Sequence, residues 1–304
     1  DLRHRSRDER TGCRWGRRLT VPVNDDVDAV RERSDSDERA MNPADSDGSQ
    51  QSTAGDGSQP STATHTLPIN ELFHSLQGEG KLAGVPTVFV RTSGCNLRCW
   101  FCDSYHTSWE PTHATMSLEE IVSTVEQYTQ TTHVVVTGGE PLIHDDIVPL
   151  LGRLDEQGYH TTVETNGTIY RDAPIHLASV SPKLASSTPT AATDPNGDGE
   201  WADRHERDRI DFEALARLVD AYESQLKFVV TGRDDLPEIE EIVEGVRART
   251  DSHVRDTDVL LMPEGTTRAE LNETRRTVAE LAAEHGYRYT PRIHVDVWND
   301  APGT

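Results

Sequence analysis

Residues 94–103 read GCNLRCWFCD and contain three of the four cysteines of the chain, Cys95, Cys99 and Cys102. Because cysteine is otherwise almost absent, this spacing indicates a site and not a feature of the overall composition. Three thiolates spaced C-x3-C-x2-C suit either an iron-sulfur cluster or zinc. A structural zinc needs a fourth protein ligand, which His106 or His113 could supply, whereas a four-iron cluster held by three cysteines leaves one iron open to a small molecule. Spacing alone leaves both interpretations open.

A second motif, TGGEP at residues 137–141, follows the run HVVV at 133–136. Three cysteines at this spacing, followed by a strand and GGEP, resemble the radical S-adenosylmethionine (SAM) superfamily, and the pair is more specific than either half. The resemblance implies that SAM chelates the open iron through its amino and carboxylate groups and that the GGEP segment holds the amino group. An electron from the cluster would then release a 5′-deoxyadenosyl radical. The pair of motifs favours the cluster over the zinc site.

The charge balance narrows the class of partner. The 304 residues include 53 acidic and 30 basic ones, a formal net charge of −23. Nucleic acids and anionic membranes are usually bound by a basic face, so neither is expected as a direct partner. Only three lysines occur, and an acidic, lysine-poor surface is typical of a protein that works in molar salt. No apolar run is long enough to span a bilayer. Cysteines that hold a cluster need a reducing compartment, so we expect a cytoplasmic protein.

Residues 1–65 are predicted to form a disordered tail. The first forty residues carry ten Arg and ten Asp or Glu, unlike the acidic remainder, and the first methionine is Met41. One hypothesis is therefore that residues 1–40 are not translated, and the alternative is a regulatory arm that includes Cys13. From Met41 to about His65 the chain is polar and cannot bury enough surface to order itself. The folded domain is expected over residues 66–304.

Strand and helix patterns alternate from residue 85 onward. The predicted strands are residues 85–91, 134–137, 161–164, 177–181, 226–230 and 259–262. Apolar stripes at helical spacing follow five of them, over residues 118–128, 147–154, 212–222, 239–246 and 267–285. Such repeated units predict an α/β fold with parallel strands and helices outside them. The polar stretch 185–209 is expected to be a surface loop.

Polar segments follow five of the predicted strands. In parallel barrels, catalytic groups gather at the carboxyl ends of the strands, so these segments should meet at one rim. They are Arg91 with the cysteines, TGGE at 137–140, ETNG at 164–167, SPK at 181–183 and MPEG at 262–265. Lys227 lies at the start of a strand and is expected to be structural.

The combination of SLQGEG at 75–80, Arg91, the cysteines followed by Asp103 and Ser104, TGGEP, ETNG and SPK resembles the 7-carboxy-7-deazaguanine synthase family over about residues 67–295. The resemblance implies an incomplete, six-stranded parallel β/α barrel of the radical SAM type and a homodimer. It also implies conversion of 6-carboxy-5,6,7,8-tetrahydropterin to 7-carboxy-7-deazaguanine with loss of ammonia, which feeds queuosine or archaeosine in transfer RNA. A ferredoxin or flavodoxin would be the electron donor.

The resemblance also assigns roles to individual residues. Those expected to contact the pterin are Leu76, Gln77, Gly78, Arg91 and Thr137. The planar guanidinium of Arg91 matches the substrate carboxylate. Cys95, Cys99 and Cys102 would ligate the four-iron cluster, and the hydroxyl of Ser104 would bind Mg²⁺. Those expected to hold SAM are Gly139, Glu140, Glu164, Asn166, Ser181, Pro182 and Lys183. Residues 262–265 match a further SAM-binding turn loosely, His294 could reach the site, and Pro302 aligns with a substrate contact by position alone.

Two other functions stay open from the sequence. Another radical SAM enzyme, such as a glycyl-radical-enzyme activase, would share the three-cysteine loop but would lack the LQGEG and SPK segments. A zinc-binding module without catalysis would need only the cysteines and a fourth ligand. Taken singly, several assignments also have structural readings, since paired glycines such as Gly138 and Gly139 most often form a tight turn.

Overall fold

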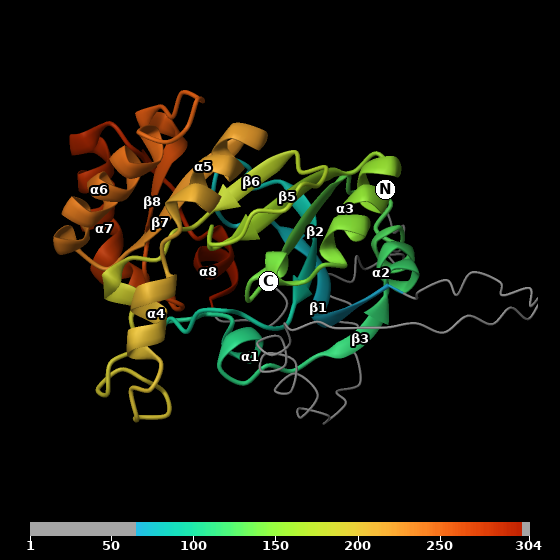
Figure 1. Cartoon of the computed structure of the whole chain (residues 1–304), viewed down its shortest axis with the longest axis horizontal. Coiled ribbons are helices and arrows are strands. Elements are labelled where there is room, and N and C mark those ends of the chain that lie inside the picture. Colours follow the sequence, from blue (N-terminus) through green and yellow to red (C-terminus); the bar gives the residue numbers. More distant parts are fainter. Residues whose placement is uncertain (1–64, 300–304) are drawn as a thin grey trace, which may run out of the picture.

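The structure, a computed structural model, describes residues 65–299. Almost all of the predicted disordered tail, the proposed start at Met41, Cys13 and Pro302 lie outside the described residues. The strands are β1 (Thr66–Leu76), β2 (Pro86–Thr92), β3 (Ala114–Ser117), β4 (His133–Gly138), β5 (His160–Thr165), β6 (Leu177–Val180), β7 (Ser224–Val230), β8 (Val259–Pro263) and β9 (Arg288–Tyr289). They form one nine-stranded sheet in the order β3-β1-β2-β4-β5-β6-β7-β8-β9 (Figure 1).

The six predicted strands are confirmed as β2, β4, β5, β6, β7 and β8, and each pairs in parallel with the next. Their residues are buried on both faces, as in β4, where Val134, Val135 and Val136 are all fully buried. Continuous apolar runs of this kind are typical of parallel strands that are covered on both sides. The predicted α/β fold with a partial parallel barrel is therefore confirmed.

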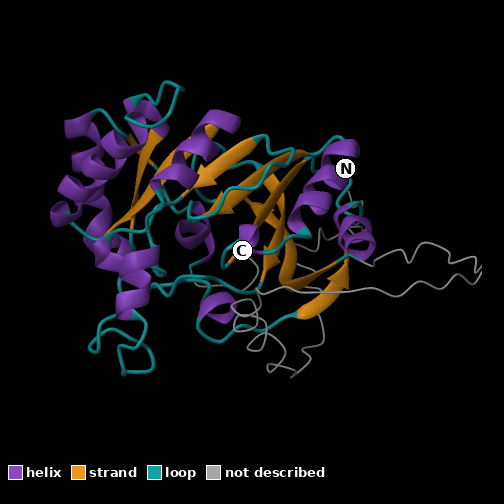
Figure 2. Ribbon diagram, viewed as in Figure 1, coloured by secondary structure: helices purple, strands orange, loops and turns teal. Residues whose placement is uncertain are grey.

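Helices α2 (Leu118–Val125), α3 (Ile147–Glu156), α5 (Phe212–Ala221), α6 (Leu236–Arg247) and α7 (Arg268–His285) lie on the outer side of the sheet (Figure 2). Three short helices, α1 (Tyr105–Ser108), α4 (Ala202–Asp208) and α8 (Ile293–Trp298), lie at the carboxyl ends of the strands instead. A capping box begins α2, at Ser117 with Glu120, and another begins α7, at Thr267 with Glu270. Each satisfies backbone N–H groups that the helix itself leaves unpaired.

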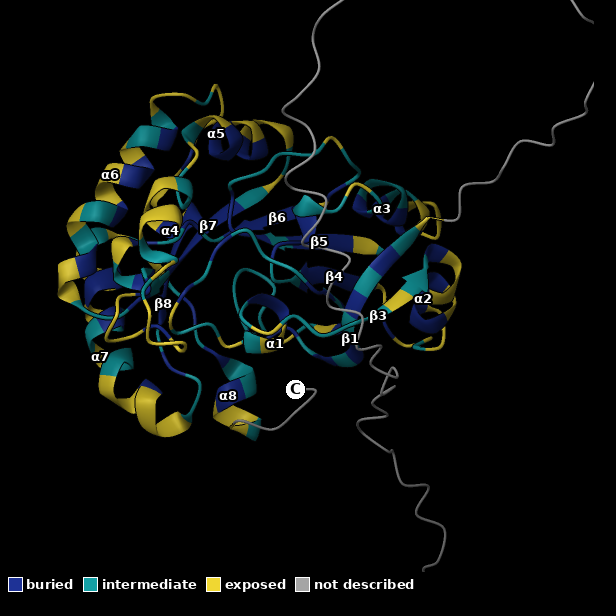
Figure 3. Cartoon of the chain, turned by 60° about the horizontal axis from the view of Figure 1, so that its bottom comes forward, coloured by how far each residue is buried: buried dark blue, intermediate teal, exposed yellow. Residues whose placement is uncertain are grey.

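The apolar stripes of α2, α3, α5, α6 and α7 face the sheet, so that their buried residues lie inward and their exposed residues outward (Figure 3). In α3, Leu150, Leu151 and Leu154 are fully buried against this core. Burying one such side chain contributes about 1.5–3 kcal/mol. Within residues 65–299, none of the helices combines the length and the apolar surface that crossing a bilayer requires.

The first strand was not predicted. β1 runs antiparallel to both β2 and β3, and its pairing with β2 is irregular between Ile69 and Glu71. Polar residues such as Asn70, Glu71 and His74 interrupt its apolar pattern, so it lacks a clear period of two. β1 nevertheless matters for the site, because it delivers residues 76–80 to the rim beside β2.

The stretch 185–209 is a correction to the sequence analysis, which predicted only a surface loop. It contains a 3-10 turn at Ala185–Ser187 and the helix α4, and His205 of that helix is fully buried. The sequence of α4, ADRHERD, has no apolar stripe, so the periodicity of apolar residues could not predict this helix. Polar contacts hold α4 in place instead of a packed apolar face.

A buried histidine begins β4. His133 Nδ1 lies 2.7 Å from Thr87 Oγ1, and its Nε2 lies 2.8 Å from Thr162 Oγ1. Burial, together with the neighbouring His160, lowers the pKa of His133 to about 4 from its ordinary 6.5. The unfolded chain therefore binds a proton near pH 6.5 that the folded chain accepts only near pH 4, so acid favours the unfolded state in this window.

We expect the free energy of unfolding to fall as the pH is lowered from 8 to 5, with His133 contributing on the order of 1–2 kcal/mol to that fall. His133→Gln should remove this share of the slope and also lower stability at pH 8, because one threonine loses its partner. Chemical unfolding followed by circular dichroism at constant salt measures both effects. His253→Gln, at an exposed position, is the matched control and should leave the dependence of the unfolding free energy on pH unchanged. An equally steep dependence in His133→Gln would show that His133 does not contribute to it.

Candidate active site

The carboxyl ends of the parallel strands surround a cavity of about 780 Å³. This volume lies within the range of pockets that bind small molecules and cofactors. Of the residues singled out from the sequence, those that line it are Leu76, Gln77, Gly78, Arg91, Cys95, Cys99, Cys102, Ser104, Thr137, Gly139, Glu164, Asn166, Ser181, Lys183, Met262, Glu264 and His294. Glu140 and Pro182 do not line it. The expectation that the polar segments meet at one rim is therefore met for nearly all of them.

The three cysteines lie on the loop after β2 and are free thiols. Burial raises the pKa of Cys95 and of Cys99 to about 12, so these side chains stay protonated unless a cation is bound beside them. Within residues 65–299, no three His, Cys, Asp or Glu side chains converge on one point where a single metal ion could sit. In a four-iron cluster each thiolate binds a different iron, so its donors surround a volume instead of a point. The donor set fits such a cluster.

The GGEP turn after β4 packs directly against the cysteine loop. The backbone N–H of Glu140 donates to Gly94 O at 2.9 Å. A Cβ atom on Gly139 would lie 2.2 Å from Gly94 O and 2.7 Å from the Cβ of Cys95, and one on Gly138, whose φ is +148°, would lie 2.3 Å from Thr92 O. No side chain fits at either position, so both glycines are required by close backbone approach.

Glu140 ties the GGEP turn to the turn after β5. Its carboxylate is fully buried and accepts hydrogen bonds from the backbone N–H groups of Asn166, at 2.6 Å, and Leu142, at 3.0 Å, and from the Thr165 hydroxyl at 2.9 Å. Burial raises the pKa of Glu140 to about 7, although these hydrogen bonds oppose the rise. Its role as a direct ligand of SAM stays a prediction, because the carboxylate already has three protein donors.

The turn after β5 in turn contacts the cysteine loop through two asparagines. Asn166 Nδ2 donates to Asn96 Oδ1 at 2.9 Å, and Asn96 Nδ2 donates to the Thr168 hydroxyl, also at 2.9 Å. The cysteine loop, GGEP and ETNG are therefore joined to one another by hydrogen bonds that none of them could make alone.

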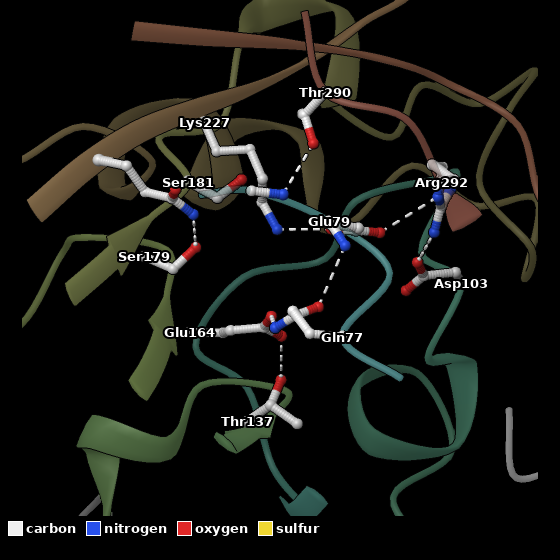
Figure 4. A network of polar contacts seen from close by, with 12 residues as sticks. Gln77, Glu79, Asp103, Thr137, Glu164, Ser179, Ser181, Lys227, Thr290 and Arg292 are labelled. Carbon is white, nitrogen blue, oxygen red and sulfur yellow. Dashed lines mark hydrogen bonds and ion pairs between the residues drawn. The ribbon is translucent and has the colours of Figure 1, made fainter. Parts of the chain in front are cut away.

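Glu164 and Gln77 both line the cavity and are bonded to each other. Gln77 Nε2 donates to Glu164 Oε1 at 3.1 Å, and the Thr137 hydroxyl donates to Glu164 Oε2 at 2.8 Å (Figure 4). These bonds join the ends of β1, β4 and β5. The sequence analysis assigned Gln77 and Thr137 to the pterin but Glu164 to SAM. The pairing of Glu164 with two residues of the expected pterin pocket was not predicted.

An ion network lies beside these residues, and sequence reasoning assigned it no ligand. Its mostly buried members are Glu79, Lys227 and Arg292, and the exposed Asp103 lies at its edge (Figure 4). His294 joins it through Nε2, which lies 3.8 Å from Glu79 Oε1. Lys227 Nζ lies 2.5 Å from Glu79 Oε2, Arg292 Nε lies 3.2 Å from Glu79 Oε1, and Arg292 also pairs with Asp103. Lys227 was expected to be structural, but it faces the cavity. A lysine inside the apolar strand QLKFVV was the available signal, whereas nothing in the sequence pointed to Arg292.

The charges of this network are fixed by their partners. Burial opposes the ionisation of Glu79, but the cations of Lys227 and Arg292 outweigh it and hold the pKa of Glu79 well below its usual range. Burial also opposes the charge on Lys227, but the carboxylates of Glu79 and Glu164 raise its pKa above the ordinary value. Glu79 and Lys227 therefore keep their opposite charges at neutral pH.

Arg91 and Ser104 meet beside Asp103. Arg91 Nη1 donates to the Ser104 hydroxyl at 2.6 Å, and that hydroxyl lies 3.2 Å from Asp103 Oδ1. A hydroxyl beside a carboxylate is a pair of hard oxygen donors of the kind that Mg²⁺ prefers. The guanidinium beside them can take a substrate carboxylate in two parallel hydrogen bonds.

Comparison with known proteins agrees with this geometry. Residues 89–184 match the radical SAM superfamily. The fold, the three-cysteine loop and this match define the chain as a radical SAM enzyme, whose cofactors are a four-iron cluster and SAM.

Relatives narrow the class. The 7-carboxy-7-deazaguanine synthase of Halobacterium salinarum is 68% identical over 255 residues, which cover 84% of this chain and 96% of that protein. The synthase of Rhodopirellula baltica is 40% identical over 240 residues, which cover 79% and 89%. The crystal structure of QueE from Escherichia coli superposes with a TM-score of 0.55 at 27% identity, over 75% of this chain and 95% of that one. This chain belongs to the 7-carboxy-7-deazaguanine synthase family, which sets aside both the activase and the zinc module.

The contact between GGEP and the cysteine loop gives a test. Gly139→Ala must push the cysteine loop outward, so we expect anaerobic reconstitution to yield well below half of the normal iron per chain. Gly152→Ala is the matched control: Gly152 lies inside α3 with nothing within 4 Å of the added Cβ, so it should keep full iron and gain up to about 1 kcal/mol of stability. Full iron in Gly139→Ala, measured with sulfide and the visible spectrum, would show that the close approach is not needed.

Proposed function

We propose that this chain converts 6-carboxy-5,6,7,8-tetrahydropterin to 7-carboxy-7-deazaguanine with loss of ammonia. The observation that carries the proposal is that the LQGEG segment and the cysteine loop line the same cavity, so a pterin held by one would lie beside the SAM bound at the other. Loss of one ammonia accounts for every atom of the substrate that is absent from the product, so the reaction needs no net oxidant. The product would feed queuosine or archaeosine.

The pterin would lie against the wall of the cavity that Leu76, Gln77 and Gly78 form. In this wall Gln77 donates to Glu164, which also accepts from Thr137. The amide and carboxylate oxygens there can accept the ring N–H groups of a pterin. Arg91 would hold the substrate carboxylate, and Ser104 with Asp103 would place Mg²⁺ against it.

SAM would lie at the other end of the cavity, near the cysteines. Gly139 offers backbone to its amino group, and Ser181 and Lys183, whose Nζ donates to the Ser181 hydroxyl at 2.8 Å, offer polar groups to its carboxylate and ribose. When bound, the cluster and SAM supply the radical that removes one hydrogen atom from the pterin. The residues of this chain orient the C–H bond, hold the two ligands in contact and exclude water from the reacting carbon.

The proposal includes partners and a compartment. A ferredoxin or flavodoxin would donate the electron, the enzyme would act as a homodimer, and the cluster requires the reducing conditions of the cytoplasm. The substrate is a small molecule, and the acidic balance of the chain argues against direct binding of nucleic acid.

The proposed activity is tested with anaerobically reconstituted enzyme, the carboxytetrahydropterin, SAM, Mg²⁺ and a chemical reductant. We expect the ultraviolet spectrum of the deazapurine to develop, with one ammonia released per product and SAM not consumed stoichiometrically. Cys99→Ala is the control and should form no product. Deoxyadenosine released without deazapurine would keep the radical SAM class and reject this substrate.

The role of Arg91 can be separated from that of the cluster. In Arg91→Lys a single ammonium replaces the two-pronged guanidinium, so we expect the KM for the pterin to rise about tenfold or more, the equivalent of one charge-assisted hydrogen bond, with unchanged iron content. Arg153→Lys on the exposed face of α3 is the matched control. An unaltered KM in steady-state assays of Arg91→Lys would remove Arg91 from the substrate site.

A further inference from the structure

The irregular pairing of β1 with β2 lies next to the site. Ile69 faces Thr92 across the two strands. Two residues further along β1, Glu71 faces Arg91, which is only one residue away from Thr92 on β2. One extra residue, Asn70, is therefore inserted in β1, and such an insertion changes the face to which the following side chains point. It decides that Glu71, and not Asn70, lies opposite Arg91.

The shift places Glu71 on the cavity side of the sheet. Ile69 and Leu72 both lie fully buried in the main core, although they are three residues apart. In a regular strand side chains alternate between the two faces, so Ile69 and Leu72 could not share one face without the extra residue. Glu71 lies between them in the sequence and lines the cavity together with Arg91.

The guanidinium of Arg91 has contacts on three sides. Glu71 Oε2 lies 3.3 Å from its Nε, and the two side chains are only 26% and 21% exposed. Its Nη1 donates to the Ser104 hydroxyl at 2.6 Å, and the group lies over the ring of Phe73 at 5.7 Å. Phe73 is itself stacked on Phe89, with the ring centroids 4.9 Å apart. These contacts hold the guanidinium in one orientation.

This orientation leaves one edge of the guanidinium for a ligand. The group carries five N–H donors. Glu71 lies beside the Nε donor, and Ser104 accepts one hydrogen of Nη1. Within the described part of the chain, the two hydrogens of Nη2 and the second hydrogen of Nη1 remain. Nη1 and Nη2 together can donate two parallel hydrogen bonds to a carboxylate.

We propose that Glu71 is a positioning residue for the substrate: it orients Arg91 so that the edge formed by Nη1 and Nη2 meets the carboxylate of the pterin. This inference rests on the proposed function, in which Arg91 binds that carboxylate. The negative charge of Glu71 would by itself weaken the attraction, because it repels a second carboxylate. Orientation and charge therefore act with opposite signs, and an experiment can separate them.

The test measures binding of two unreactive pterins to the reconstituted full chain, with SAM and Mg²⁺ but without reductant. The probe is 6-carboxypterin, and 6-methylpterin, which lacks the carboxylate, is the matched ligand. Equilibrium dialysis followed by pterin fluorescence gives the Kd of each.

Two variants separate reach from charge. Glu71→Gln keeps an oxygen at the same reach without the charge, so its Kd for 6-carboxypterin should stay within about twofold of the original. Glu71→Asp keeps the charge but is one methylene shorter. Its Kd for 6-carboxypterin should rise about fivefold, of the order expected for one hydrogen bond, while the Kd for 6-methylpterin stays unchanged.

Two controls accompany these variants. In an Arg91→Lys background the ammonium has no planar edge to orient, so adding Glu71→Asp should change the Kd by less than about twofold. Glu119→Gln, at an exposed position of α2, removes a carboxylate far along the chain from the site and should leave both Kd values unchanged. Iron is measured in every variant.

The outcomes separate the inference from the proposed function. Weaker binding of 6-carboxypterin alone in Glu71→Asp, with near-original binding in Glu71→Gln, supports the inference. Unchanged or tighter binding in Glu71→Asp overturns it, as does an equal loss in both variants or for both pterins. Loss of iron from both variants also overturns it, because Glu71 would then build the site as a whole.

The unaltered chain provides the remaining comparison. If it binds both pterins equally, the proposed role of Arg91 fails and this inference fails with it. If it prefers 6-carboxypterin and Glu71→Asp keeps that preference, only the inference about Glu71 is overturned.

Discussion

The site depends on the contact between the GGEP turn and the cysteine loop. Two backbones approach so closely there that neither Gly138 nor Gly139 can carry a side chain, and the Glu140 N–H is bonded to Gly94 O. From this contact Glu140 reaches across to Asn166, and Asn166 returns to the cysteine loop through Asn96. Three turns that follow three different strands are thereby held as one rigid unit, as a site that must position two ligands against each other requires.

A chain that is acidic overall keeps its few lysines in the interior of the fold. Lys227 pairs with Glu79 in the cavity wall, and Lys183 donates a hydrogen bond to the Ser181 hydroxyl there. Lys81, whose side chain is mostly buried, lies 3.1 Å from Asp258. Buried ion pairs seldom stabilise a fold relative to apolar packing, because desolvation offsets their attraction. The pair of Lys227 with Glu79 and the contact of Lys183 with Ser181 are therefore better understood as ordering the walls of the site, whereas Lys81 and Asp258 lie outside it.

Much of the fold could be predicted because its strands are apolar on both faces and its helices carry regular stripes. Val134 to Val136 and the stripe of α3 are patterns that few other structures would produce. The site residues could be placed at one rim for a related reason, since parallel strands send their carboxyl ends to the same side. β1, α4 and α8 escaped prediction because they are short, irregular or polar, and their positions come from contacts with distant segments.

The sequence by itself determined the parallel sheet and the segments that meet at its rim, because each of these follows from local periodicity. It also determined the class of cofactor, through the resemblance that the cysteine spacing and GGEP together carry. The tertiary structure decided which side chains those segments pair with. The salt bridge between Glu79 and Lys227 joins residues 148 positions apart in the sequence, and that between Asp103 and Arg292 joins residues 189 positions apart. His205 contacts Arg98 and Ser187 from a helix that has no apolar stripe. Such pairings depend on where the folded chain brings distant residues together, and that position is not encoded in the spacing of either partner.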